Sequence, residues 1–287
     1  MLKKYNRTIF FYGLSLIIPW ILWFIVAYFS HMENKSSLIM FLMPVLGVLG
    51  LVSPVFVAGY LFLIDKDLME DLKNRIFNMQ NFNFLYFVIT FLLIPLSIVI
   101  AQLISVFFGH SLSQFYISGN PSFTSFVFSP WFILVFAPIV EELAWHSYGT
   151  DTLRRRYNLF ITSIIFSFYW VIWHLPLSFI KGYYHSNVIA DGLLYSLNFV
   201  FSLFVFVILM NWLYYKTKRN IFTAIIFHLT ANISNEIFAT HPDSKVIQTV
   251  LLLIVTIIIL IFDNKMFFQR KLLIDNFSLR LTAAIRH

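Results

Sequence analysis

The chain contains no cysteine among its 287 residues. This absence excludes a structural disulfide, a thiolate nucleophile and any cysteine-ligated metal site. Charged residues are also scarce, at 11% of the chain, whereas a soluble domain has about 25%. A removable signal peptide is not expected either, because the apolar run behind Lys3, Lys4 and Arg7 is too long and carries no cleavage site. We expect that run to be the first membrane span.

Apolar residues, in contrast, make up 60% of the chain, including 35 Phe, and the mean hydropathy is +0.81. A helix crosses a bilayer with roughly 20 mostly apolar residues, and the sequence predicts eight such segments. They are Thr8–Ser30, Leu38–Ile64, Phe84–Phe108, Phe123–Gly149, Asn158–Ile180, Ile189–Tyr215, Asn220–Thr240 and Val246–Phe262. The predicted fold class is therefore all-α, a polytopic membrane helix bundle of about eight transmembrane helices.

The distribution of basic residues predicts the topology. If the N-terminus lies in the cytoplasm, all but three of the 20 Lys and Arg residues fall in cytoplasmic segments, and the exceptions are Lys35, Lys181 and Lys245. Such an asymmetry is the positive-inside signal. The net charge of +7 is then explained by contact with anionic lipids at the cytoplasmic face, without a nucleic-acid partner. We expect a multi-pass protein of the cell membrane with both termini in the cytoplasm.

The chain is expected to form one membrane domain with three parts. Residues 1–122 hold the first three spans, residues 123–240 hold the four spans that carry polar motifs, and residues 241–287 hold the last span and a basic cytoplasmic tail. The segment Asp65–Asn83 is predicted to include an amphipathic surface helix. The tail after Asp263 mixes apolar and basic residues and is expected to lie on the inner leaflet.

Two adjacent carboxylates, Glu141 and Glu142, lie inside the fourth predicted span. Ionisable residues inside a span are costly, so each is a candidate for function. Neighbours on a helix point about 100° apart, so one carboxylate is expected to face a cavity and the other a partner helix. His146 follows Glu142 by one helical turn, so these two can touch. The alternative is an ion pair or proton relay that only braces the bundle.

Two further spans carry polar residues at helical spacing. Trp170 and His174 lie four residues apart in one span, and His228 and Asn232 lie four apart in another, so each pair shares a helix face. Either pair alone could serve interhelical hydrogen bonding, which is common in membrane bundles. The histidines at outer boundaries are expected to be wetted interfacial side chains. They are His31, His110, His185 and His241.

Two prolines distort the helices beside these groups. Pro138 removes the helical partner of the Leu134 carbonyl, and Pro176 does the same to the carbonyl of Ile172. Carbonyl groups freed inside a membrane need water or protein partners. The pattern therefore predicts a water-filled cavity next to the ionisable residues.

The three polar elements are expected to lie at similar depth. At about 1.5 Å rise per residue, Glu141, His174 and His228 come roughly 15–24 Å from the inner ends of their helices. We therefore expect them to converge on one buried site that opens to the cytoplasm.

In order and spacing, the three elements resemble the motifs of the CPBP group of intramembrane proteases. This group includes CAAX prenyl endopeptidases and bacterial bacteriocin-processing or self-immunity proteins, and its pattern is Glu-Glu-x-x-x-Arg, Phe-x-x-x-His and His-x-x-x-Asn or Asp. The resemblance covers Phe123 to about Thr240, and the run Trp173 to Pro176 is similar to bacterial members. The corresponding residues of this chain are Glu141, Glu142 and His146, then Trp170 and His174, then His228 and Asn232.

Two positions depart from the pattern. Trp170 in place of Phe keeps an aromatic wall. His146 stands in place of Arg, and histidine can lose its charge whereas arginine cannot. A pair formed by Glu142 and His146 predicts an activity that depends on pH, and His146→Arg should restore a permanent pair.

The resemblance implies an intramembrane endopeptidase. Glu141 would activate a water molecule with the help of His174. His228 and Asn232 would hold the oxyanion that develops on the substrate carbonyl. The supporting residues would be Glu142, His146 and Trp170.

The need for a cofactor stays open at this point. The mechanism just given requires none, but Glu141, His174 and His228 could instead hold a catalytic zinc with one open position. The His-Glu-x-x-His signature of many zinc proteases is absent.

Rival functions and several substrates are compatible with the sequence. A non-catalytic immunity factor or scaffold is one rival, supported by His146, and a transporter would predict repeats between the two halves, which we do not find. The expected partner is a membrane-embedded or membrane-associated peptide. Because the run Trp173 to Pro176 is similar to bacterial members, a bacteriocin leader, a pheromone precursor or a membrane-protein tail is expected rather than a prenylated CAAX protein.

Overall fold

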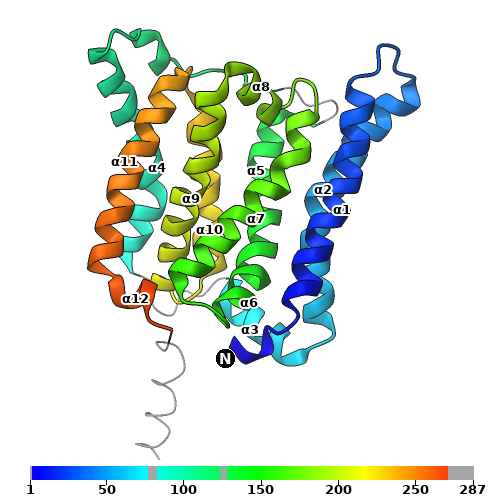
Figure 1. Ribbon diagram of the computed structural model, residues 1–287, viewed down its shortest axis with the longest axis vertical. Helices are drawn as coiled ribbons and strands as arrows, with labels where there is room; N and C mark the ends of the chain where they lie inside the picture. Colours follow the sequence, from blue (N-terminus) through cyan, green and yellow to red (C-terminus); the bar gives the residue numbers. More distant parts are fainter. Residues whose placement is uncertain (1, 77–82, 122, 124–127, 271–287) are drawn as a thin grey trace, which may run out of the picture.

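The computed structural model describes residues 2–76, 83–121, 123 and 128–270. Within these residues the chain forms a bundle of helices, and the predicted all-α fold class is confirmed. The extended pairing in this part of the chain is an isolated antiparallel bridge between Ile117 and Phe238. Figure 1 shows the long helices standing side by side.

Six helices among the described residues are long and apolar enough to cross a membrane. Each agrees with a predicted span to within a few residues. They are α1 (Thr8–Ser30), α2 (Ser37–Leu63), α4 (Phe84–Phe107), α7 (Leu159–His174) with the 3₁₀ turn η4 (Leu175–Phe179), α9 (Leu193–Lys216) and α11 (Pro242–Phe262).

The two other predicted spans are shorter, and they carry the carboxylates and one of the polar pairs. The fourth span is divided into α5 (Pro130–Ala144), the π-helical turn η3 (Trp145–Gly149) and α6 (Thr150–Arg154). The seventh is α10 (Ile221–Ile237), with 17 residues. Both lie within the bundle, α5 against α2 and α10, and α10 against α4 and α9. The predicted number of eight spans is therefore approximate.

The remaining elements are short and connect or flank the long helices. They are η1 (Leu2–Lys4), α3 (Lys66–Ile76), η2 (Leu112–Phe115), α8 (Tyr184–Asp191) and α12 (Asn264–Phe268). Helix α3 confirms a surface helix in the predicted segment, with Leu68 and Arg75 buried. The predicted position of the tail falls largely on residues 271–287, which lie outside the described residues.

Polar caps define where several helices begin. A side-chain oxygen accepts a backbone N–H at the start of α2, α4, α7 and α10, and this satisfies a donor that the first helical turn leaves free. Proline stands in the first turn of α5 and α11, where its missing N–H costs nothing. The capping residues are Ser36, Asn83, Asn158 and Asn220, and the prolines are Pro130 and Pro242.

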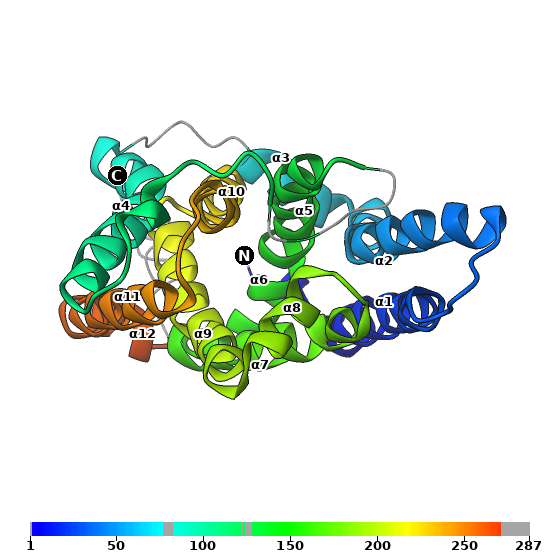
Figure 2. The same ribbon diagram turned by 90° about the horizontal axis from the view of Figure 1, so that it is seen from above.

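The helices are arranged around a centre formed by α5, α7, α9 and α10. Figure 2 shows α1 and α2 as a pair on one side of this centre, with α4 and α11 on the other. The outer helices expose apolar side chains such as Ile17, Phe56 and Leu96. An apolar outer surface is what a lipid environment requires.

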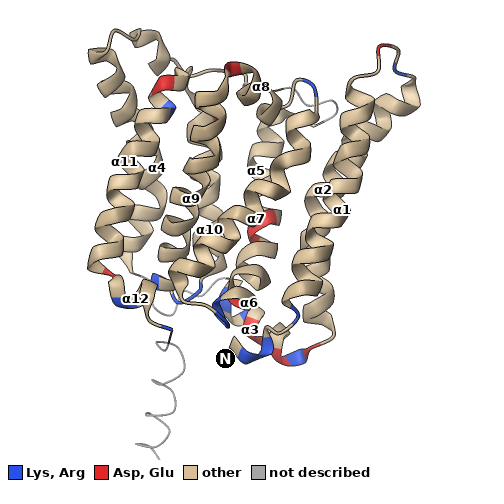
Figure 3. Cartoon of the chain, viewed as in Figure 1, with Lys and Arg blue, Asp and Glu red and all other residues tan. Residues whose placement is uncertain are grey.

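Lysine and arginine gather at the end of the bundle that holds the N-terminus, as Figure 3 shows. We call this the basic end, formed by residues 2–7, 65–76, 150–158, 216–220 and 263–270. At the opposite end, Lys35 and Lys181 lie in connections between helices, and Lys245 lies in the first turn of α11. The charge asymmetry predicted from the sequence is therefore present in the fold, while the side of the membrane that each end faces stays a prediction.

A buried group of charged and phenolic side chains closes the basic end. Arg75 pairs with Asp71 at 2.8 Å and with Asp151 at 3.2 Å, and Arg219 pairs with the same two carboxylates. The Tyr5 hydroxyl donates to Asp71 and accepts from Arg75. Burial alone would raise the pKa of Asp71, but Arg75 and Arg219 outweigh it and hold that pKa below its usual range. We call these five residues the basic-end cluster.

Candidate active site

A cavity of about 520 Å³ lies among the central helices. Its wall includes Glu141 of α5, Trp170 and His174 of α7, and His228 and Asn232 of α10. The structure thus brings together five of the seven residues that the sequence singled out. The other two, which lie next to Glu141 along the chain, are fully buried behind it.

Trp170 is the side chain around which the site is assembled. Its indole Nε1 donates to the Glu141 carboxylate at 3.1 Å, and Trp145 donates to the same oxygen at 3.4 Å. The Trp170 ring also stands edge-on to His228, with centroids 5.3 Å apart, and lies 5.4 Å from the His174 ring. One aromatic side chain therefore contacts the carboxylate and both histidines. A phenylalanine at this position could not supply the indole donor.

His174 has a defined tautomer. Its Nδ1 lies 2.7 Å from the backbone carbonyl of Trp170, and a carbonyl oxygen only accepts hydrogen bonds. The proton must therefore sit on Nδ1, which leaves the lone pair of a neutral ring on Nε2. A side chain in this state can accept a proton from a water or a substrate group in the cavity.

Glu142 faces away from the cavity and joins two histidines. One carboxylate oxygen accepts from Nδ1 of His228 at 2.7 Å, and the other accepts from Nδ1 of His146. The two neighbouring glutamates thus face in different directions, as their helical spacing predicts. Because Nδ1 of His228 is engaged, Nε2 is the nitrogen left for a reacting group.

His146 occupies the family's arginine position within the π-helical turn η3. Its Nε2 lies 3.1 Å from the amide oxygen of Asn211, whose amide nitrogen donates to Ser163. In this arrangement the ring donates from both nitrogens, as an imidazolium does. A ring protonated in this way would balance the charge of Glu142 in a site without water access.

The carbonyl groups that the prolines free have protein partners. The amide nitrogen of Asn232 donates to the carbonyl of Leu134 at 3.4 Å, one helical turn before Pro138. The indole of Trp20 donates to the carbonyl of Ile172 at 3.1 Å. The first contact ties α10 to α5 next to Glu141. Since an amide nitrogen carries two hydrogens, Asn232 keeps one for a substrate.

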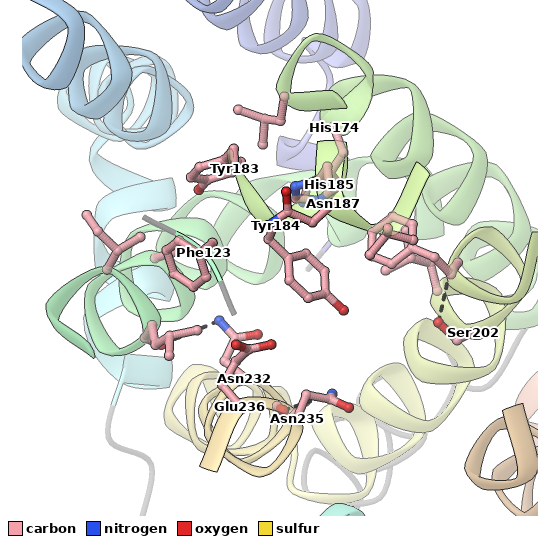
Figure 4. A pocket seen from close by; sticks show the side chains of 18 of the residues that line it. Phe123, His174, Tyr183, Tyr184, His185, Asn187, Ser202, Asn232, Asn235 and Glu236 are labelled. Atoms are coloured by element: carbon pink, nitrogen blue, oxygen red, sulfur yellow. Dashed lines mark hydrogen bonds between the residues drawn. The ribbon is translucent and has the colours of Figure 1, made fainter. Parts of the chain in front are cut away.

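The cavity runs from Glu141 toward the end of the bundle opposite the basic end. Figure 4 shows Asn232, Asn235 and Glu236 on one side of the opening and Tyr183, Tyr184 and His185 across from them. Toward the basic end, Glu142, His146 and all members of the basic-end cluster except the partly exposed Asp71 are buried. The structure therefore places the mouth of the cavity away from the basic end, and the prediction that the site opens to the cytoplasm stays a prediction. The position of a residue along its helix gives its distance from each end of the bundle. It does not show toward which end the space is filled by side chains.

The three residues considered as zinc ligands are not placed as a ligand set. Among the described residues, ligand atoms of three such side chains lie within 4.8 Å of one another at His110, His241 and Asp243. Glu141, His174 and His228 do not form such a group. Their geometry therefore favours the metal-free mechanism over a zinc held by these three side chains.

Two residues near the site were not predicted to belong there. His185, expected to be a wetted interfacial side chain, lines the cavity and stacks on His174 with ring centroids 4.9 Å apart. Its Nδ1 is buried and has no hydrogen-bond partner within the described residues. Asn211 pairs with Nε2 of His146. The sequence feature that could have drawn attention to Asn211 is an amide inside an apolar span. No sequence pattern connects either residue to the motifs, because both reach the site through tertiary packing.

Comparison with known proteins adds to this geometry. Residues 123–234 match a family described as type II CAAX prenyl endopeptidase Rce1-like. A protein of Methanococcus maripaludis named CAAX prenyl protease 2 is 36% identical over 269 residues, which are 93% of this chain and 97% of that protein. The matched family segment contains all seven motif residues that the sequence singled out.

Proposed function

The chain belongs to the Rce1-like family of CAAX prenyl endopeptidases, and from this premise we propose that Glu141 and His174 activate the water that cleaves its substrate. The protein is an intramembrane protease of the CAAX type. The observation that supports the proposal best is the orientation of Glu141, whose carboxylate is held at the cavity wall by the indole of Trp170. Neither indole nitrogen acts as an acid or a base at neutral pH, so the two indoles position the carboxylate without competing with it for the proton of the water.

The proton transfers follow from the hydrogen bonds. Glu141 takes a proton from water as the oxygen attacks the scissile carbonyl. Nε2 of His174 accepts a hydrogen bond from the same water and so fixes its direction of attack. The proton held on Glu141 then passes to the departing amine, which completes the cleavage.

The oxyanion would be held by α10. His228 can donate from Nε2 while it donates from Nδ1 to Glu142 only as an imidazolium, and the Glu142 carboxylate stabilises that form. The free hydrogen of the Asn232 amide is the second donor. Donors fixed in this way before the reaction stabilise the developing charge more than mobile water does.

We propose that the substrate is a peptide anchored by a lipid chain. The CAAX motif carries a prenyl group on its cysteine, and the cavity wall has an apolar part suited to such a chain, between α2 and α5. Its residues there include Val48, Leu51, Leu134 and Ala137. Polar side chains line the other part, including Asn187, Asn198 and Asn235, and these suit a peptide backbone.

The test uses the purified full chain in lipid nanodiscs with a farnesylated peptide that ends in a CAAX sequence. Mass spectrometry of the products should show cleavage by the wild type and none by Glu141→Ala. Glu70→Gln, which changes an exposed carboxylate on α3, is the matched control and should cleave normally. An intact farnesylated peptide after incubation with the wild type would contradict the substrate class. Comparison of membrane peptides from cells that carry wild type or Glu141→Ala would then identify the true class.

The same assay tests the metal-free mechanism. Because the ligand atoms of Glu141, His174 and His228 are not gathered around one point, activity should survive a chelator. Loss of activity on chelation with recovery on added zinc would instead support the zinc version.

A further inference from the structure

A second group of chemically active side chains lies at the end of the bundle opposite the basic end. His110 follows α4, while His241 and Asp243 begin α11. The sequence assigned both histidines to wetted interfacial positions. Their side chains are 23% and 45% exposed, and that of Asp243 is 41% exposed. All three are therefore open to water.

The three ligand atoms lie within 4.8 Å of one another. Nε2 of His110 lies 3.2 Å from the Asp243 carboxylate, and Nδ1 of His241 lies 3.6 Å from it. A tetrahedral zinc with bonds of about 2.0–2.2 Å holds its ligand atoms about 3.4 Å apart. The observed spacings are close to that value without any movement of the backbone.

The two imidazole rings lie close to each other. Those of His110 and His241 have centroids 4.2 Å apart and planes inclined by 35°. A divalent ion binds both rings in their neutral form.

Other protein groups hold these ligands in place. The Tyr195 hydroxyl donates to the second oxygen of Asp243 at 2.8 Å, which leaves the first oxygen for a metal. The backbone N–H of Asp243 donates to Nδ1 of His241 at 3.2 Å. That hydrogen bond shows that Nδ1 is the unprotonated nitrogen of the ring, and a metal ligated there would replace this contact.

The backbone that carries the ligands is itself braced by buried polar contacts. Ser244 of α11 donates to Gln114 at 2.6 Å, and Gln114 donates to Ser105 at 2.8 Å. Gln102 of α4 donates to Thr240 at 2.8 Å, just before His241. These contacts fix the segment after α4 against the start of α11. A metal bound there would not have to order a flexible loop.

The nearby charges set limits on the site. The N-terminus of α11 is partly positive and opposes a cation, but Asp243 in its first turn offsets this. Lys245 is directed toward Glu236, at 3.9 Å. Two neutral imidazoles and one carboxylate then leave a bound divalent ion with one surplus positive charge, as in many zinc sites.

We propose that His110, His241 and Asp243 bind a divalent ion of the zinc class, with water in the fourth position. The ion would connect α4 to α11 at the rim of the cavity, whose wall includes Thr240, Pro242 and Tyr195. Its role would be to stiffen the rim. It is separate from the reacting groups.

The test measures metal binding by the full chain in detergent, with any affinity tag removed. Zinc bound after gel filtration should be one equivalent per chain, and cobalt should give the visible absorption of a tetrahedral site. His110→Gln with His241→Asn should lower zinc affinity at least tenfold, because an amide is a poor zinc ligand. Asn at position 241 still caps α11, so the double variant should keep the wild-type thermal midpoint without metal.

Two controls separate this site from others. His31→Gln removes a histidine at the same end outside the cluster and should bind zinc as the wild type does. Glu141→Ala should also keep the equivalent of zinc. Chelation should lower the thermal midpoint of the zinc-loaded wild type but leave the double variant unchanged. Equal zinc binding by wild type and double variant, or loss of zinc in Glu141→Ala, would overturn the proposal.

Discussion

At the scale of single residues, the site depends on two adjacent glutamates with different surroundings. Glu141 accepts from two indole nitrogens at the cavity wall. Glu142 accepts from two histidines behind that wall. This difference supports the proposal that the first carboxylate transfers protons and the second positions its neighbours.

The role proposed for His228 can be distinguished from that of a base. Glutamine can donate a hydrogen bond but cannot take up a proton. If His228 holds the oxyanion, His228→Gln should keep more kcat than His228→Ala, which should lose about 10²–10³ in rate. The measurement is kcat for peptide cleavage, compared between His228→Gln and His228→Ala. Equal, complete loss in both variants would identify His228 as a base instead.

His146 is expected to matter for stability more than for substrate recognition. His146→Ala removes one of two partners of Glu142 and leaves the Asn211 amide oxygen unpaired. Breaking a buried ion pair costs about 3–5 kcal/mol, so the free energy of unfolding should fall by about that amount. Denaturant unfolding in detergent measures it, with His31→Ala as an exposed control. Wild-type stability would show that His146 does not replace the family's arginine.

At the scale of elements, the π-helical turn η3 depends on a distant helix. Its geometry leaves carbonyl groups without helical partners. Arg75 of α3 donates to the carbonyls of His146 and Ser147 at 3.2 and 2.9 Å, and Tyr214 of α9 donates to the first. Helix α3 thus supports the turn that positions both glutamates.

Removal of the contacts between Arg75 and η3 should destabilise the side of the active site that faces the basic end. Arg75→Gln breaks buried pairs with Asp71 and Asp151, and it leaves the η3 carbonyls short of donors. We expect a loss of about 3–5 kcal/mol in the free energy of unfolding and a lower kcat. Lys73→Ala, an exposed change on the same helix, should have neither effect. If Arg75→Gln, like the control, unfolds at the same denaturant concentration as the wild type, α3 does not support the turn.

The sequence predicted these elements to different degrees. The apolar runs located the six long helices, because length and hydropathy alone determine a span. The hydrogen bond from Asn232 to the carbonyl of Leu134 was predictable only in part. Pro138 indicated that this carbonyl has no helical partner, but the sequence did not show which residue would donate to it. The π-turn and Arg75 were not predictable, because the turn is stabilised by residues about 70 positions away along the chain.

At the scale of the whole molecule, the topology and the direction of the cavity have to be considered together. The charge asymmetry predicts that the basic end lies in the cytoplasm, and the cavity leads to the other end. A substrate made in the cytoplasm would then have to enter from the bilayer, along the apolar wall between α2 and α5. The orientation therefore decides the route of the substrate.

The absence of cysteine makes this orientation simple to measure. Single cysteines can be introduced at Lys35 and Lys181 at one end, and at Lys73 and Lys218 at the other, without background labelling. A membrane-impermeant maleimide added to intact cells should label the first two only. Labelling of Lys73→Cys or Lys218→Cys from outside would reverse the topology and place the cavity mouth in the cytoplasm.

The convergence of the motifs beside a cavity was predictable from the sequence, but the end of the bundle toward which the cavity runs was not. Trp170, His174 and His228 were expected on inward faces, and the structure places all three on one wall. The position of His185 beside His174 depends on how α8 folds over the cavity, which no local pattern encodes. Packing between helices likewise decided which end of the site is closed.

The most direct test of the account replaces Glu141 by glutamine, which keeps the shape and can still accept from Trp170. The account predicts that kcat falls by about 10²–10⁴, the usual contribution of a general base, while the Kd for the lipidated peptide stays within about twofold. Single-turnover cleavage and binding are measured on the same nanodisc preparation. Cleavage by Glu141→Gln at the wild-type rate would contradict the account, because the amide cannot take a proton from water.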